Sequence, residues 1–232
     1  MKIPSIEQML KAGMHFGHRT GKWHPKMEPF IFGERHGVHI IDLMQTKKLF
    51  EEALEFIKKF SSEGKMILFV GTKMQVKESI AALAKETEMP YVKEKWLGGT
   101  LTNFLVLKRT IKKYQGLSAK KKTGDLSKYT KKEQLDFDRE IEKLEFKVGG
   151  LNKMTRLPDA IFVWDIKTEK TAVTEAKKRN IPIIAICDTN VNPTGINYVI
   201  PSNDDATKTI KLVLDTVKEA ILAGKAEKKL IN

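Results

Sequence analysis

The sequence has few of the features that mark secreted or membrane proteins. Its 232 residues include a single cysteine, Cys187, so no disulfide can form within the chain, which favours a reducing compartment. It contains no run of eighteen apolar residues that could cross a bilayer. Its first residues lack the long apolar core of a signal peptide. The sequence therefore predicts a cytoplasmic protein with no membrane partner.

Motifs for nucleotide binding and for nucleophilic catalysis are also missing. The loop that follows the first apolar run, Gly71-Thr72-Lys73, has one glycine and matches neither GxGxxG nor GxxxxGK[ST]. Ser202 does not lie in a GxSxG turn, and Cys187 has no flanking cation that would lower the pKa of its thiol. We therefore expect no catalytic residue and no required cofactor.

Acidic residues are scarce in one part of the chain. Between Lys93 and Lys132 there are twelve Lys or Arg and two acids, so this stretch supplies +10 of the formal net charge of +13. A localised block of one sign with aromatic residues in it is typical of a surface that binds phosphate. A solvated charged surface is the alternative, although mixed charge serves solubility better.

Four short apolar runs alternate with amphipathic segments. The runs cover residues 66–70, 160–164, 183–187 and 198–200, and the predicted helices cover 46–61, 75–87, 168–179 and 206–222. The runs are apolar on both faces, as expected of strands that helices cover on both sides. This alternation predicts an α/β fold with a doubly wound parallel sheet.

No strand pattern appears between Trp96 and Pro158. Two sets of apolar residues there have heptad spacing: Phe104, Leu107, Ile111 and Tyr114, then Phe137, Ile141, Leu144, Val148 and Leu151. Thr130 and Glu133 form a capping box before the second set. We predict a protruding antiparallel helical hairpin with coiled-coil packing over residues 104–153. It is inserted into an α/β domain of residues 1–103 and 154–224, which has an N-terminal extension (1–42) and is followed by a flexible tail (225–232).

Carboxylates follow the predicted strands at Asp165, Asp188, Asp204 and Asp205. In a parallel sheet they would converge at one edge, and such a cluster suits a hard cation or a phosphotransfer site. Aspartate is also a common turn and N-cap residue, which is the simpler interpretation. A phosphotransfer or phosphatase enzyme that uses Asp165, Asp188 and Asp204 is the alternative function.

All five histidines lie between His15 and His39. Structural zinc sites made of histidines alone are uncommon, so structural or RNA-facing roles are favoured over a metal site of this kind. A mixed site that joins His18 to the strand-end aspartates requires the N-terminal segment to fold back over the sheet edge.

Two segments combine glycines, cations and aromatic residues, which suits close approach to a phosphate backbone and stacking on bases. They cover residues 15–27 and 95–104. With the basic stretch they give these candidate RNA-binding residues: Arg19, Lys22, Trp23, Lys26, Lys95, Trp96, Thr100, Asn103, Lys108, Arg109, Lys112, Lys113, Lys120, Lys121 and Lys122. Core packing is the alternative for both tryptophans. A protein-docking adaptor with an acidic partner is a further alternative for the hairpin.

Ordered segments from the N-terminus to about residue 224 resemble the bacterial small-subunit ribosomal protein two family. They include His15-Phe16-Gly17-His18, Trp96-Leu97-Gly98-Gly99-Thr100-Leu101-Thr102-Asn103-Phe104 and Ile200-Pro201-Ser202-Asn203-Asp204-Asp205-Ala206. The resemblance implies a flavodoxin-like domain with a coiled-coil hairpin and a non-catalytic, structural role in the small ribosomal subunit.

The resemblance also implies partners and a metal. The partners are small-subunit ribosomal RNA, neighbouring ribosomal proteins and, in bacteria that have it, the large ribosomal protein that helps to recruit messenger RNA. A divalent metal ion near the strand-end aspartates makes Asp188, Asp204 and Asp205 candidate ligands, with His18 beside them.

Overall fold

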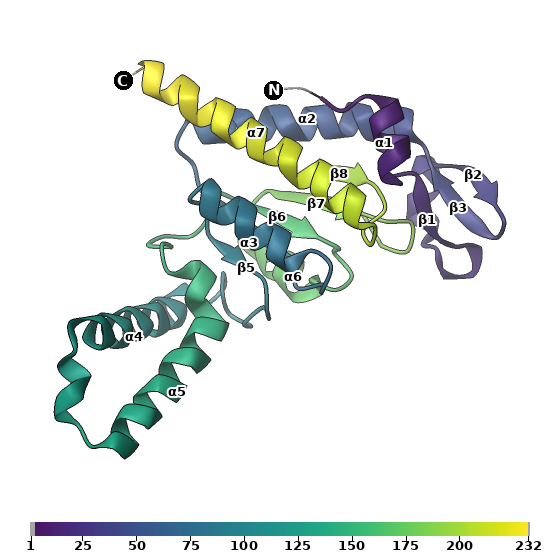
Figure 1. Ribbon diagram of the computed structural model, residues 1–232. Coiled ribbons are helices and arrows are strands. Elements are labelled where there is room, and N and C mark those ends of the chain that lie inside the picture. Colours follow the sequence, from purple (N-terminus) through teal and green to yellow (C-terminus); the bar gives the residue numbers. More distant parts are fainter. Residues whose placement is uncertain (1–2, 232) are drawn as a thin grey trace.

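The protein, described by a computed structural model over residues 3–231, contains one large and one small sheet (Figure 1). The large sheet has the parallel order β5-β4-β6-β7-β8. Its strands are β4 (Ile67–Val70), β5 (Tyr91–Val92), β6 (Ala160–Trp164), β7 (Ile183–Cys187) and β8 (Tyr198–Pro201). In chain order this is 2-1-3-4-5, a doubly wound arrangement whose switch point lies between β4 and β6. The predicted α/β fold with a parallel sheet is confirmed.

Helices cover both faces of this sheet. One face packs against α2 (Leu43–Ser62), α3 (Lys77–Glu86) and α7 (Thr207–Ile231), and the other packs against α6 (Lys170–Lys178). Neighbouring strand residues point to opposite faces, so Phe69 joins the first core and Leu68 the second. Every residue of β4, β6 and β7 is therefore buried, which explains their uninterrupted apolar runs.

The N-terminal extension forms a second, antiparallel sheet of order β1-β3-β2, which the sequence analysis missed. Its elements are α1 (Ile6–Ala12), β1 (Phe16–Arg19), the 3-10 turns Thr20–Lys22 and Pro25–Phe30, β2 (Ile31–Arg35) and β3 (Val38–Ile41). His36 and Gly37 connect β2 to β3 with φ values of 52° and 75°. A two-residue hairpin with both residues left-handed matches the twist of the strands it joins.

Two helices stand between β5 and β6, where no strand was predicted. They are α4 (Phe104–Thr123) and α5 (Lys131–Val148), joined by the 3-10 turn η3 (Asp125–Lys128), and η4 (Gly149–Leu151) follows. The two helices pack side by side and project away from the sheets (Figure 1). The capping box of Thr130 and Glu133 is confirmed. Lys120–Lys122 lie in the last turn of α4. Coiled-coil packing of the two helices stays a prediction.

The last helix is longer than the sequence indicates. The structure continues α7 to Ile231, whereas a flexible tail was predicted over residues 225–232. Lys225 Nζ donates to the Thr87 carbonyl at 2.6 Å, and Glu227 lies 2.5 Å from Lys58 Nζ, so tertiary contacts hold this extension. Residue 232 of the predicted tail lies outside the described residues. Within residues 3–231, no helix is long and apolar enough to cross a membrane.

Two glycines of the hairpin should respond in opposite ways to alanine. A Cβ at Gly150 would lie 2.2 Å from the Tyr91 carbonyl oxygen, whereas Gly116 lies inside α4 with open space around it. We expect Gly150→Ala to lower the free energy of unfolding by about 1–3 kcal/mol, because the backbone must shift. Gly116→Ala should raise it by about 0.5–1 kcal/mol. Chemical denaturation of both variants tests this, and equal effects would contradict it.

Candidate functional site

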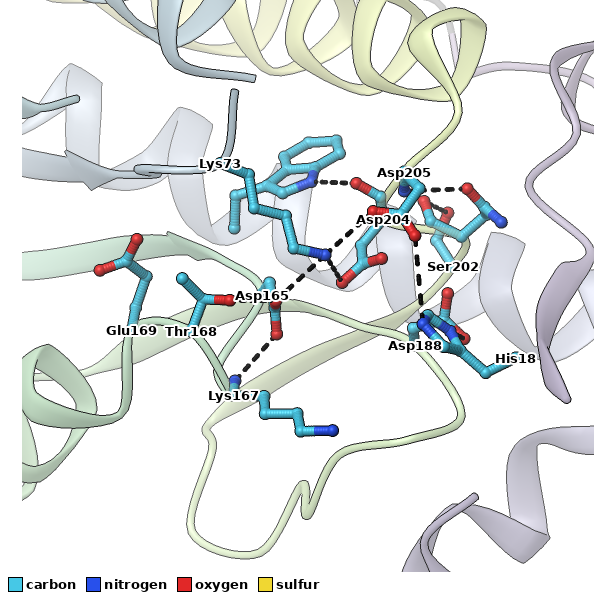
Figure 2. A network of polar contacts seen from close by, with 12 residues as sticks. His18, Lys73, Asp165, Lys167, Thr168, Glu169, Asp188, Ser202, Asp204 and Asp205 are labelled. Carbon is cyan, nitrogen blue, oxygen red and sulfur yellow. Dashed lines mark hydrogen bonds and ion pairs between the residues drawn. The ribbon is translucent and has the colours of Figure 1, made fainter. Parts of the chain in front are cut away.

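Charged side chains meet at the carboxyl edge of the parallel sheet, as the sequence predicts (Figure 2). Lys73 follows β4, Asp165 follows β6, Asp188 follows β7, and Asp204 follows β8. The three aspartates are buried and Lys73 is partly exposed. Buried carboxylates are stable only when paired or hydrogen-bonded, so the partners of each one decide what this cluster can do.

Lys73 supplies positive charge to the cluster. Its Nζ lies 2.7 Å from Asp204 Oδ2, 3.1 Å from Asp165 Oδ2 and 3.1 Å from Asp205 Oδ1. Burial alone would lower the pKa of Lys73, but the hydrogen bonds and charges of Asp204 and Asp165 raise it above its ordinary value. Lys73 therefore stays protonated and serves as a counter-charge rather than as a general base.

The N-terminal segment brings His18 to the same edge. At Gly17 a Cβ would lie 2.6 Å from the Thr189 side chain, so this glycine allows β1 to cross close over the strand ends. The His18 N–H donates to Thr189 Oγ1 at 2.9 Å, and His18 Nδ1 lies 3.1 Å from Asp188 Oδ1. The hydrogen bond to Asp188 raises the pKa of His18. The N-terminal segment thus folds back over the sheet edge, as a mixed histidine–aspartate site requires.

Two carboxylate oxygens of the cluster have no partner. Asp188 Oδ2 and Asp204 Oδ1 are buried and accept no hydrogen bond. Burial and the nearby charge of Asp188 raise the pKa of Asp204 to about 7. His18, Asp188 and Asp204 each offer a ligand atom within 4.8 Å of the others, a donor set that fits a divalent metal. Asp205, also a predicted ligand, lies outside this group, half-exposed and 4.0 Å from His18 Nε2.

At the switch point between β4 and β6, the loop after β4 is hydrogen-bonded to a side chain of the protein itself. In doubly wound folds the crevice at this point is where ligands bind. Here the Thr72 N–H and Oγ1 both donate to Glu169 Oε1, at 2.8 and 2.6 Å. The backbone donor that could bind a phosphate is therefore already bonded to an internal carboxylate.

The groups that a phosphotransfer enzyme would need are likewise engaged or buried. Asp165 accepts hydrogen bonds from the Lys167 N–H and the Thr168 hydroxyl in addition to its contact with Lys73. Cys187 is fully buried, and burial raises the pKa of its thiol, which makes it a poor nucleophile. This geometry argues against the phosphotransfer alternative.

The other histidines do not join the cluster and have local roles. The His15 ring contacts Phe16, and burial lowers the pKa of His15. His24 Nδ1 accepts from the Lys26 N–H, and His39 packs against Trp23 with ring centroids 5.3 Å apart. The sequence analysis favoured structural or RNA-facing roles over a site of histidines alone. These contacts are structural, and contact with RNA stays a prediction.

Most of the predicted RNA-binding residues lie on the surface in two areas. The first area, in the N-terminal extension, has Arg19, Lys22, Trp23 and Lys26 exposed. The second is the exposed face of α4, with Lys108, Arg109, Lys112, Lys120 and Lys122. In the same helix Lys113 pairs with Glu140 of α5, and Lys121 pairs with Asp138 of α5 at 2.7 Å. Part of the basic charge is thus balanced within the hairpin.

Two predicted RNA contacts are buried instead. The Trp96 side chain is 8% exposed and its Nε1–H donates to Glu175 at 3.0 Å, and Thr100 is 1% exposed with its hydroxyl bonded to the Leu97 carbonyl. Neither side chain presents a face to a partner, so core packing is the correct interpretation for Trp96. Lys95 and Asn103, in the same segment, are exposed.

Glu175 of α6 is the functionally placed residue that the sequence analysis missed. Its buried carboxylate accepts hydrogen bonds from Trp96 Nε1 and from the N–H groups of Gly99, Leu101 and Thr102, at 2.8–3.0 Å, and from the Thr102 hydroxyl. The one signal in the sequence is an acidic residue on the apolar face of an amphipathic helix, between the buried Val173 and Ala176.

The acid stability of the protein should depend on Glu175. Burial alone would raise its pKa, but the hydrogen bonds from Trp96 and the loop N–H groups lower it below the ordinary 4.5. A carboxylate with a depressed folded-state pKa stabilises the fold above its unfolded pKa, and this contribution is lost as the pH falls through the folded value. We expect Glu175→Gln to lower the free energy of unfolding by about 2 kcal/mol at pH 7, because N–H groups of the loop lose the carboxylate that accepts their hydrogen bonds.

The difference in the free energy of unfolding between Glu175→Gln and the wild type should become smaller as the pH falls below 4.5. Denaturant unfolding between pH 3 and pH 7 measures it, with the exposed Glu52→Gln as the matched control. A difference that stays constant over this range would contradict the assignment.

The comparison with known families covers nearly the whole chain. The model of the family described as ribosomal protein S2 matches residues 9–224. This range contains both sheets, the strand-end cluster and the two projecting helices. The chain therefore belongs to the ribosomal protein S2 family, as its sequence segments suggest.

Proposed function

We propose that this protein binds small-subunit ribosomal RNA and neighbouring ribosomal proteins, and that it works in the ribosome as a structural component without catalysis. Family membership makes it a ribosomal protein of the small subunit with a role in translation. The observation that supports RNA binding most directly is the row of exposed cations on α4, which have no acidic partner on their own helix.

The exposed face of α4 suits a phosphate backbone. Lys112 lies four residues after Lys108 and three after Arg109, so each of these two cations neighbours Lys112 on the surface of the helix. The last turn adds Lys120 and Lys122. Contacts of this kind position a protein on RNA without reading its sequence, and recognition then comes from the shape of the RNA.

The N-terminal extension offers the second contact area. Trp23 is 37% exposed and rests on His39, which leaves part of its ring free to stack on an unpaired base. Arg19, Lys22 and Lys26 lie close to it in the chain and are exposed. We propose that this area binds single-stranded or irregular RNA.

The alternatives receive less support. A phosphotransfer enzyme would need free backbone donors at the switch point, and there the Thr72 N–H is bonded to Glu169. Docking to proteins is compatible with RNA binding, so we include neighbouring ribosomal proteins as partners. In bacteria that have it, the large protein that helps to recruit messenger RNA is one of these partners.

We propose that the protein acts on ribosomes in the cytoplasm.

Neutralising two cations of α4 should weaken RNA binding in a salt-dependent way. For Arg109→Gln combined with Lys112→Gln we expect lower affinity for small-subunit ribosomal RNA. The slope of log affinity against log salt should fall by about one unit for each lost phosphate contact. Filter binding or fluorescence anisotropy between 50 and 300 mM KCl measures the slope.

The matched control removes the same charge from the other arm of the hairpin, with Lys143→Gln and Lys147→Gln on α5. Equal losses of affinity and slope for both pairs would mean that net charge, rather than the α4 surface, drives binding. Wild-type affinity that does not respond to salt would refute the proposed function.

We further propose that the strand-end cluster binds a divalent metal ion through His18, Asp188 and Asp204. The unpartnered oxygens of Asp188 and Asp204 supply the argument, because a cation would compensate both. When bound, the metal would act as a structural cross-link between the N-terminal segment and the sheet edge.

Metal binding should appear as added stability. We expect Zn²⁺ or Mn²⁺ to raise the melting temperature of the EDTA-treated protein, since a ligand of the native state stabilises it by mass action. Asp188→Asn should abolish the shift, while the exposed Asp215→Asn should keep it. Differential scanning fluorimetry with each metal tests this, and an equal shift in both variants would contradict the site.

A further inference from the structure

The helical hairpin of α4, η3 and α5 is joined to the sheet domain at its base, where α6 holds the segment from which α4 starts. This segment, the base loop, comprises residues 96–103. It runs from the buried Trp96 to the first turn of α4. Its conformation therefore sets the direction in which α4 leaves the sheet domain.

Glu175 of α6 and Arg179, the residue that caps the C-terminus of α6, both bind the backbone of the base loop. Glu175 accepts the N–H groups of Leu101 and Thr102, at 2.9 and 3.0 Å. Arg179, one turn later, donates through Nε to the Leu101 carbonyl at 3.1 Å and through Nη2 to the Thr102 carbonyl at 2.5 Å. Charge-assisted hydrogen bonds of this kind are stronger and more directional than neutral ones.

The other arm of the hairpin returns at a fixed point. A Cβ at Gly150 would lie 2.2 Å from the Tyr91 carbonyl oxygen, so η4 packs directly on β5. Val148 and Leu151 are buried there with Leu107 and Ile111 of α4. Both arms thus have their positions set at the base, by polar contacts on one side and by close packing on the other.

The length of the hairpin magnifies any motion at the base. A helix of this length spans roughly 30 Å, at 1.5 Å per residue. A tilt of about 10° at the base would displace the last turn of α4 by about 5 Å, more than the length of an ion pair with a phosphate. A tilted hairpin would therefore have to return to its original angle before Lys120 and Lys122 could contact phosphates, and RNA binding would have to supply the free energy for this ordering.

We propose that Glu175 is a positioning residue for RNA binding, which fixes the angle of the hairpin in the free protein so that its cations are arranged before RNA arrives. The proposal rests on the proposed RNA-binding function. Glu175 itself is buried and would touch no RNA. By holding the hairpin at one angle, Glu175 would reduce the conformational entropy that is lost when RNA binds.

The direct test is the distribution of distances between the hairpin and the sheet domain. Spin labels at Lys48→Cys on α2 and Lys122→Cys on α4 would report it, and the buried native Cys187 should not take up label. We expect a narrow distribution in the wild-type background and a broader one with Glu175→Gln. Lys178→Gln, on the exposed side of α6, is the matched control and should leave it narrow.

Binding to small-subunit ribosomal RNA provides the second measurement. Glu175→Gln should lower the affinity about tenfold at a temperature where the variant is folded, with the salt slope unchanged because no phosphate contact is removed. A merely structural role would lower the melting temperature and leave the distances and the affinity of the folded protein as they are. If Glu175→Gln does not fold, Arg179→Gln, which leaves the carboxylate in place, serves instead.

Each outcome decides the matter. A broader distribution with weaker binding supports the proposal. Unchanged distances, or broader distances with unchanged affinity, overturn it. Wild-type protein that binds RNA without salt dependence refutes the proposed function rather than this inference, because the spin-label distances still show whether Glu175 fixes the hairpin.

Discussion

The rest of the structure depends on how the carboxyl edge of the parallel sheet compensates its buried negative charge. Asp165, Asp188 and Asp204 meet there, and Lys73 lies between Asp165 and Asp204. Such charges are tolerated only with partners at hydrogen-bonding distance, because a lone buried carboxylate is very costly. This need explains why the N-terminal segment crosses the edge to bring His18 to Asp188, and why Gly17 and Thr189 approach so closely.

The switch point of the sheet differs from the arrangement that is typical of ligand-binding doubly wound folds. In those folds the crevice at the switch point is left open for a ligand. Here the Thr72 N–H donates its hydrogen bond to Glu169. Lys73 is paired with the carboxylates of Asp165 and Asp204. The exposed cations that we propose bind RNA lie outside the large sheet. They belong to the small N-terminal sheet region and to the helical hairpin. The scaffold and the proposed RNA-binding surface are thus different parts of the chain.

The sequence predicted the elements whose signals are local. Strands β4, β6 and β7 could be found because burial on both faces requires uninterrupted apolar runs, and the second hairpin helix because Thr130 and Glu133 cap it. The small sheet was missed because its short strands are partly exposed and lack alternation. Trp96 was ambiguous because its partner, Glu175, lies 79 residues away. The aspartate cluster was predictable from topology, but the distances that leave Asp205 outside it were not.

The contacts that close the sheet edge also bear on how the chain emerges during its own synthesis. The hydrogen bond between His18 and Thr189 spans 171 residues, and the one between Asn203 and Phe16 spans 187. Contacts of such long range form late, because the intervening chain must be present and closed into a loop. In a nascent chain β1 can pair with β3, but its contacts with the sheet edge cannot form until the residues after β7 and β8 have left the exit tunnel. We expect this protein to depend on chaperones more than its size alone suggests. The surface of its N-terminal segment that packs on the sheet edge stays uncovered until most of the chain has been made.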